Sequence, residues 1–179
     1  VLERKEQLGI RILNISVGAC SKRGMSENSA LVKGVNRAWD AGLVVVVAAG
    51  NNGPRTMSIT TPGISRKVIT VGCSDDDREV LVGGNRMVDY SGRGPTAACI
   101  CKPDLVAPGC SVVSCSSRAD KYTIKSGTSM STPIVSGAVA LLLERFPDMS
   151  NKDVKLRLRE SSVDIGLPGL LDVGKMLER

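Results

Sequence analysis

The sequence predicts an α/β domain with three layers, in which a mostly parallel β-sheet is covered by helices on both faces. Residues 43–49, Leu-Val-Val-Val-Val-Ala-Ala, are apolar without alternation. This pattern is typical of a central parallel strand that is buried on both sides. Strand-like and helix-like segments alternate along the rest of the chain. Aromatic residues make up only 2% of the 179 residues, so the core has to be built from Val, Ile, Leu and Ala, which suits such a sheet.

The start of the chain predicts a helix, a strand and a second helix. Residues 1–8 have the character of the last turns of a helix that Gly9 closes. The β-branched residues of segment 10–17 predict a strand. Ser26 is the expected N-cap of a helix that runs to Ala41. The buried face of this helix is expected to comprise Leu31, Val32, Val35, Ala38 and Trp39.

The later strands are short and are separated by turn residues. They are expected at residues 67–73, 104–107, 111–115 and 122–125, and residues 79–90 are expected to form a hairpin around Gly83-Gly84.

Three helices are expected in the last third of the chain. The first ends near Phe146-Pro147, and the second begins at Ser150, where Asp153 completes a capping box. In the second helix Val154 and Leu158 are expected to face the core, and Lys155, Arg157 and Arg159 to face solvent. A turn-rich segment and a short helix follow.

The charge and hydropathy patterns argue against two classes of partner. The net charge is +6, but Lys and Arg are interleaved with Asp and Glu, so no nucleic-acid partner is expected. No run of about 18 apolar residues is present, so no membrane-spanning segment is expected. The chain opens with Val1 and within a helix, so the lack of a signal peptide leaves both a secreted and a cytoplasmic location open.

Six cysteines lie at positions 20, 73, 99, 101, 110 and 115. Because no Cys-x-x-Cys pair and no histidine are present, no metal site is assigned, although Cys99 and Cys101 with Cys110 keep a zinc site as an alternative. Cys73 and Cys115 fall at the ends of predicted strands and are expected to pack as small apolar side chains. An even number of cysteines permits disulfides without requiring them.

Segment 126–143 predicts a buried helix with a candidate nucleophile in its first turn. A proline is tolerated only near the start of a helix, so this helix begins within about four residues before Pro133. Thr128 and Ser129 then lie beside free N–H groups at the positive end of the helix dipole. A nucleophilic serine would suit this place, and the alternative is an ordinary Ser/Thr cap.

Polar residues follow two of the predicted strands. Ser16-Val17-Gly18 ends the first strand, and Gly50-Asn51 ends the strand at 43–49. Ligands of parallel α/β sheets bind beyond the carboxyl ends of the strands. An amide at position 51 could donate a hydrogen bond to an oxyanion, and residues 16–18 could pair with an extended peptide. The alternatives are a plain turn residue and a plain strand exit.

The segment Gly127-Thr128-Ser129-Met130-Ser131-Thr132-Pro133, followed by Ser136-Gly137, resembles the nucleophile motif of the subtilisin-like serine proteases, the subtilases. Segments 13–18, 46–51, 90–95, 102–109 and 169–172 resemble other parts of that family in the same order. Ile134 departs from the family, since many subtilisins carry a His after the Pro; this change is expected to affect packing alone.

The resemblance implies a subtilisin-like fold and a serine endopeptidase that acts on polypeptides. Ser129 would be the nucleophile and Asn51 the oxyanion donor. Substrate-binding residues would be Ser16, Val17, Gly18, Gly50 and Thr128. No cofactor is required, while a structural cation, calcium or sodium, is left open; Asp104 could hold it or could be a solvated loop carboxylate.

The chain contains no histidine, so it lacks the general base that a serine nucleophile needs. In subtilases that His and its Asp partner lie N-terminal to the serine segment. Residues 1–179 are therefore expected to be the C-terminal portion of a subtilase catalytic domain, an incomplete fold that is inactive alone. The strand at 10–17 is then an open edge through which self-association is expected. The alternative is a non-catalytic subtilase-like domain that binds peptides.

Overall fold

The computed structural model describes residues 1–19, 28–117, 121–166 and 168–178. Its centre is a parallel four-stranded sheet in the order β1-β2-β3-β6. The strands are Ile12–Ile15 (β1), Val44–Ala48 (β2), Ile69–Cys73 (β3) and Leu105–Ala107 (β6). Every residue of β2 and β3 is buried, which confirms the predicted central strand and the parallel sheet.

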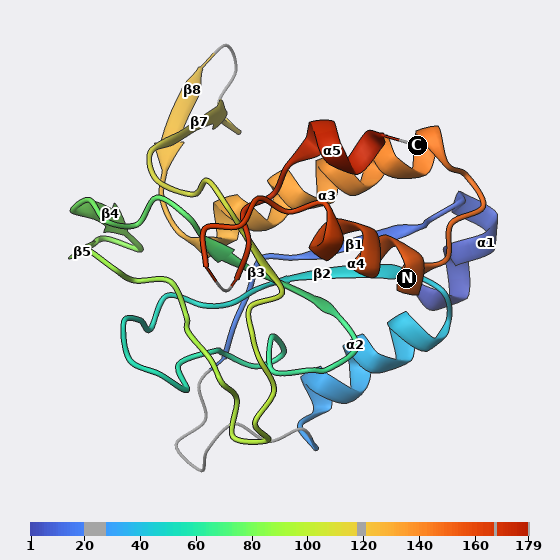
Figure 1. Cartoon of the computed structure of the whole chain (residues 1–179), viewed down its shortest axis with the longest axis horizontal. Helices are drawn as coiled ribbons and strands as arrows, with labels where there is room; N and C mark the ends of the chain where they lie inside the picture. Colours follow the sequence, from blue (N-terminus) through green and yellow to red (C-terminus); the bar gives the residue numbers. More distant parts are fainter. Residues whose placement is uncertain (20–27, 118–120, 167, 179) are drawn as a thin grey trace.

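Helices cover both faces of this sheet (Figure 1). α3, Thr128–Arg145, crosses all four strands on one face and packs against α5, Val173–Leu177. α2, Ala30–Asp40, lies on the opposite face against β2. The core between the layers consists largely of Val, Leu, Ile and Ala. The predicted three-layer α/β/α architecture is confirmed.

The helices at the start of the chain differ from expectation in their details. A 3₁₀ turn, η1 (Leu2–Arg4), precedes α1 (Lys5–Leu8), which Gly9 ends in the left-handed conformation as predicted. α2 has Ser29 as its N-cap, so the predicted start at Ser26 is wrong; Ser26 itself lies outside the described residues. Leu31 is 47% exposed and does not belong to the buried face, because it lies on the solvent side of the first turn.

No described helix combines the length and the apolar character that crossing a bilayer requires.

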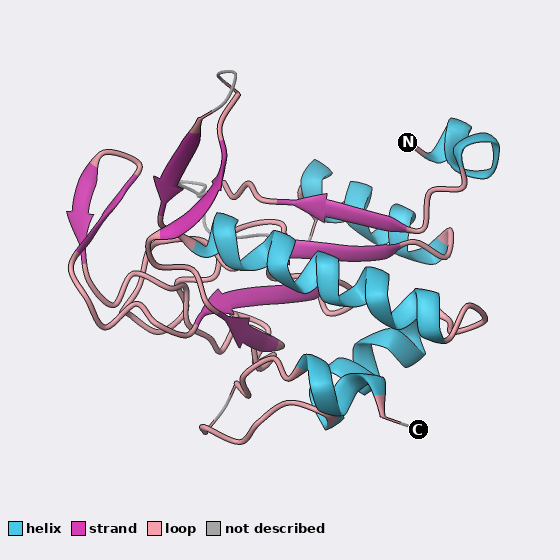
Figure 2. Ribbon diagram, turned by 90° about the horizontal axis from the view of Figure 1, so that it is seen from above, coloured by secondary structure: helices cyan, strands magenta, loops and turns pink. Residues whose placement is uncertain are grey.

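Two hairpins project beyond the carboxyl ends of the central strands (Figure 2). β4 (Val80–Val82) and β5 (Asn85–Met87) form the predicted hairpin around Gly83-Gly84. β7 (Val112–Cys115) and β8 (Tyr122–Lys125) pair with each other and not with the central sheet. No helix in the described ranges covers this second hairpin, so Cys115 is exposed, and its expected place in the core is wrong.

α4 spans Asn151–Glu160 and begins with the predicted capping box of Ser150 and Asp153. Val154 and Leu158 are buried as expected. Lys155 does not face solvent, since its side chain is 14% exposed and its Nζ donates to the Val68 carbonyl over 2.9 Å. Arg157 is also held against the protein, because its Nε donates to the Met176 carbonyl. Arg159 is exposed as predicted.

The two edges of the central sheet differ in their backbone pairing. The outer side of β6 is covered, because Val106 exchanges hydrogen bonds of 2.9 Å with Gly169 and Leu171. In the described part of the chain no strand pairs with the outer side of β1. The Arg11 carbonyl accepts from Val44 on β2, so the alternate residues Ile12 and Asn14 direct their backbone groups away from the sheet. β1 is therefore an open edge strand.

Candidate active site

The candidate nucleophile lies where α3 begins, at the carboxyl ends of the strands (Figure 2). Gly127 is the N-cap, with a φ of 135° that side chains rarely adopt. Ser129 follows in the first turn and is partly buried, and its Oγ donates a 2.9 Å hydrogen bond to the Ser16 carbonyl. A carbonyl oxygen orients this hydroxyl but cannot remove its proton, so the serine is positioned without being activated.

Asn51 is brought to the same helix terminus. Its Oδ1 accepts hydrogen bonds of 3.0 Å from both the backbone N and the Oγ1 of Thr128. These bonds fix which way the amide points and leave Nδ2 without a hydrogen bond to any described residue. A Cβ on Gly127 would lie 3.3 Å from that Nδ2, so the free amide group sits against the residue that precedes Thr128 and Ser129. An amide held in this way can donate to an oxyanion.

Thr128 and Gly50 hold Asn51 in place. Thr128 is fully buried, and its Oγ1 accepts a 3.2 Å hydrogen bond from the Gly50 amide. The Gly50 carbonyl accepts from the Gly92 amide, so both polar groups of Gly50 are used inside the chain. That these two residues also contact a substrate stays a prediction.

Residues 16–18 form a wall, that is, a surface segment beside the candidate nucleophile. Val17 is 62% exposed, and the next residues are tied down because Ala19 and Thr61 exchange backbone hydrogen bonds. Thr60 lies beneath this wall: a Cβ on Gly18 would come within 2.2 Å of its Oγ1, and one on Gly50 within 2.5 Å. Thr60 Oγ1 itself donates to the Ala49 carbonyl. One threonine thus separates the two segments that were expected to bind substrate.

Asp104 is neither solvated nor placed to receive a metal cation. Its side chain is 5% exposed and is held by two ammonium groups, with Lys102 at one oxygen and Lys155 at the other, 2.5 and 3.1 Å away. It also accepts from the Thr70 amide. Burial lowers the pKa of Lys102 to about 8 despite the carboxylate beside it. Both expectations for Asp104 are wrong because sequence spacing did not reveal the two lysines.

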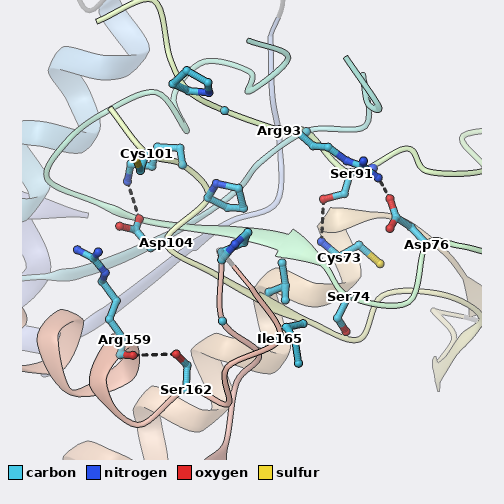
Figure 3. Close-up of a pocket in the computed structure, with 18 of the residues that line it drawn as sticks. Cys73, Ser74, Asp76, Ser91, Arg93, Cys101, Asp104, Arg159, Ser162 and Ile165 are labelled. Atoms are coloured by element: carbon cyan, nitrogen blue, oxygen red, sulfur yellow. Dashed lines mark hydrogen bonds and ion pairs between the residues drawn. The ribbon is translucent and has the colours of Figure 1, made fainter. Parts of the chain in front are cut away.

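A pocket of about 950 Å³ lies elsewhere (Figure 3). It is bordered by Ser91 and Arg93, by Asp104, and by Arg159 and Ile165. Neither the candidate nucleophile nor the candidate oxyanion donor lines it. The candidate active site is therefore separate from this pocket and lies beside the exposed Val17.

Some residues that shape the site carry no recognisable signal in the sequence. Thr60 occurs in a run of turn-forming residues and is identifiable only from its contacts with Gly18 and Gly50. Cys73 and Cys110 lie far apart in the chain but close together in space, whereas Cys99 and Cys101 are exposed and join no potential metal-binding group among the described residues.

Comparison with known proteins identifies the family of the chain. The model of the Subtilase family matches residues 2–173. Serine protease AprX of Bacillus subtilis (strain 168) is 40% identical over 167 residues, covering 86% of this chain and 38% of that protein. Subtilisin DY of Bacillus licheniformis is 34% identical, with 92% of this chain and 54% of that protein covered. The chain thus spans roughly two fifths to one half of the length of these relatives.

Solved structures show the same fold. Sphericase superposes with a TM-score of 0.74 at 28% identity, covering 94% of this chain and 54% of that one. A mutant of the protease domain of PatA gives a TM-score of 0.75 at 27% identity, covering 98% and 61%. The parallel sheet, the layers and the family match over nearly all residues lead to one conclusion: the chain belongs to the subtilase family.

Proposed function

We propose that this chain supplies the serine and oxyanion half of a subtilase active site, and that the protein containing it is a serine endopeptidase. The observation that carries the proposal is the double hydrogen bond from Thr128 to Asn51 Oδ1, which joins the amide to the residue preceding Ser129. The His and Asp of the triad would come from a portion of the catalytic domain N-terminal to residues 1–179, because these residues contain no histidine.

The chemistry assigns each group a step. Ser129 Oγ attacks the carbonyl carbon of a peptide bond, and its proton passes to the His of the preceding portion. The carbonyl oxygen becomes an oxyanion, which receives a hydrogen bond from Asn51 Nδ2 and is favoured by the positive end of α3. The His then protonates the leaving amine, and water hydrolyses the acyl-enzyme.

The substrate would lie along Ser16, Val17 and Gly18. The exposure of Val17 leaves this segment accessible, and an extended peptide can add to such an edge through main-chain hydrogen bonds. Polypeptides are therefore the proposed substrate class.

Labelling with a serine-directed fluorophosphonate tests the proposal. The chain alone should react slowly, because Ser129 donates to a carbonyl and has no base. A longer chain that includes the preceding residues of the same protein should be labelled rapidly at Ser129 and should hydrolyse casein. Ser129→Ala is the control for both.

Two outcomes contradict the proposal. Rapid stoichiometric labelling of the chain alone would show that no external base is needed. A longer chain that neither labels at Ser129 nor cleaves casein, but binds peptides, would favour a non-catalytic peptide-binding domain.

A further inference from the structure

Two thiols and a carboxylate gather beyond the carboxyl ends of β3 and β6, away from Ser129. Cys73 is the last residue of β3, Asp75 follows two residues later, and Cys110 comes shortly after β6. Their two sulfur atoms and one carboxylate oxygen all lie within 4.8 Å of one another. The Cys73 thiol donates to Asp75 Oδ1 over 3.1 Å. Cys110 is 35 positions from Asp75 in sequence, so only the fold brings it to the other two residues.

One hydroxyl group and several apolar side chains surround this cluster. Tyr90 is fully buried, and its hydroxyl lies 3.2 Å from each sulfur atom. Val82 and Met87 of the β4–β5 hairpin pack against the same group. Cys110 and Asp75 are only partly buried, so the cluster can be reached from solvent.

The donor set is that of a thiophilic divalent cation. Zinc binds thiolates at about 2.3 Å and carboxylates at about 2.0–2.2 Å in a tetrahedron, so its ligand atoms lie roughly 3.3–3.8 Å apart. The cluster needs only small side-chain movements to reach that spacing. We propose that Cys73, Cys110 and Asp75 bind one zinc-class cation, with water as the fourth ligand and the Tyr90 hydroxyl as a hydrogen-bond donor to the bound sulfur.

Binding replaces two S–H bonds with two metal–sulfur bonds. The two protons leave to solvent, and neither sulfur nor metal changes oxidation state. Calcium and magnesium prefer oxygen ligands, so a donor set with two thiolates selects against them. The site is therefore selective for thiophilic ions.

One residue, Gly109, connects the proposed site to the start of α3. Asp75 Oδ1 also accepts from the amides of Gly109 and Cys110, at 2.7 and 3.1 Å. The Gly109 carbonyl in turn accepts from the amide of Gly127, the N-cap of α3. Because the ligands meet only in the folded chain, a bound cation should stabilise it and brace the start of α3.

The test is a titration of the reduced chain with Zn²⁺ and with Cd²⁺, whose bonds to thiolate absorb in the ultraviolet. The expected result is one tightly bound ion per chain, cadmium–thiolate absorption, and a higher Tm with Zn²⁺ but not with Ca²⁺ or Mg²⁺. Cys73→Ala and Cys110→Ala should abolish the absorption and the rise in Tm. Tyr90→Phe, which removes an outer hydrogen-bond donor, should weaken binding by about 10–100-fold.

Cys115→Ala is the matched control, because Cys115 is exposed and lies outside the cluster. Circular dichroism of each variant verifies that it folds. Tight binding that survives Cys73→Ala, or that Cys115→Ala abolishes, overturns the proposal. So does a reduced chain that binds no Zn²⁺ while the oxidised chain contains a Cys73–Cys110 disulfide, since the two thiols would then be a redox pair.

Discussion

Thr128 connects the two halves of the candidate catalytic group. Its Oγ1 donates to Asn51 and accepts from Gly50, while its backbone amide holds Asn51 as well. The side chain of Thr128 is fully buried and pairs with two polar groups, so replacing it is costly, because a buried group left without a partner costs free energy.

Replacing Thr128 with Val keeps the shape of the side chain but removes the two hydrogen bonds of Oγ1, while the backbone amide can still donate to Asn51. In the active catalytic domain we expect kcat to fall with little change in KM, because the oriented Asn51 amide is needed in the transition state. In a subtilisin, from which the range is taken, loss of the asparagine donor lowers kcat by about 10²–10³. Thr128→Val should lower kcat by less than this.

The same variant should lower the free energy of unfolding by about 1–3 kcal/mol, measured with urea, because the buried Gly50 amide loses its acceptor. Thr128→Ser retains the hydroxyl and should preserve kcat. If Thr128→Ser were as slow as Thr128→Val, the methyl group and not the hydroxyl would position Asn51.

Lys102 gives a second prediction at the scale of single residues. Its pKa falls from 10.5 to about 8 in the folded chain because of burial, although Asp104 opposes the shift and Lys155 adds to it. Between these two pKa values the unfolded chain binds more protons than the folded chain. The contribution of Lys102 to the free energy of unfolding therefore rises with pH in this window and is lost as pH falls through about 8.

Urea unfolding at pH 7 and pH 10 measures this effect as a difference between the wild type and Lys102→Met. We expect the wild type to gain stability relative to the variant at the higher pH. Lys67→Met is the control, because Lys67 pairs with Asp40 at the surface, and it should show no such gain. A wild-type advantage that shrinks between pH 7 and pH 10 would contradict the direction of the shift.

At the scale of whole elements, β1 has an unpaired edge in the described part of the chain, and α3 has a partly exposed side. α3 buries Val135, Val139 and Leu142 against the sheet, yet Leu141 on another side is 47% exposed. The outer edge of β1 lies unpaired in the described part of the chain. An unpaired edge strand favours pairing with a second copy.

We therefore expect the chain alone to self-associate as its concentration rises, which sedimentation velocity measures. Asn14→Lys places a charge on an exposed residue of the edge strand and should shift the chain toward monomer. Leu81→Lys makes the same kind of change on the β4–β5 hairpin and should not. A wild-type chain that stays monomeric at high concentration would remove the basis for this expectation.

For the whole molecule, local sequence patterns predicted the fold well. The apolar run at 43–49, the capping box at Ser150 and the turn at Gly83-Gly84 each depend on neighbours in sequence, and each matches the structure. The failures involve distant partners. Lys155 was placed in solvent because helical periodicity cannot show that Asp104, 51 positions earlier, lies beside it.

The candidate site shows the same division. Ser129 was placed at a helix start from Pro133 alone, a local signal. The resemblance to subtilases pointed to Asn51, but the positioning roles of Thr128 and Gly50 required the hydrogen bonds that join residues 78 positions apart. Cys115 was placed in the core because a strand end in sequence does not reveal whether a helix covers it.

Thr60 carries a consequence for how this protein can diversify. Gly18 and Gly50 both press against it, so neither can acquire a side chain unless position 60 changes as well. In the proposed peptide-binding role, single mutations would change peptide preference first at Val17, which is 62% exposed. Libraries that vary position 18 should pair it with smaller residues at 60, whereas Gly50 also has a φ of 94° that disfavours any side chain.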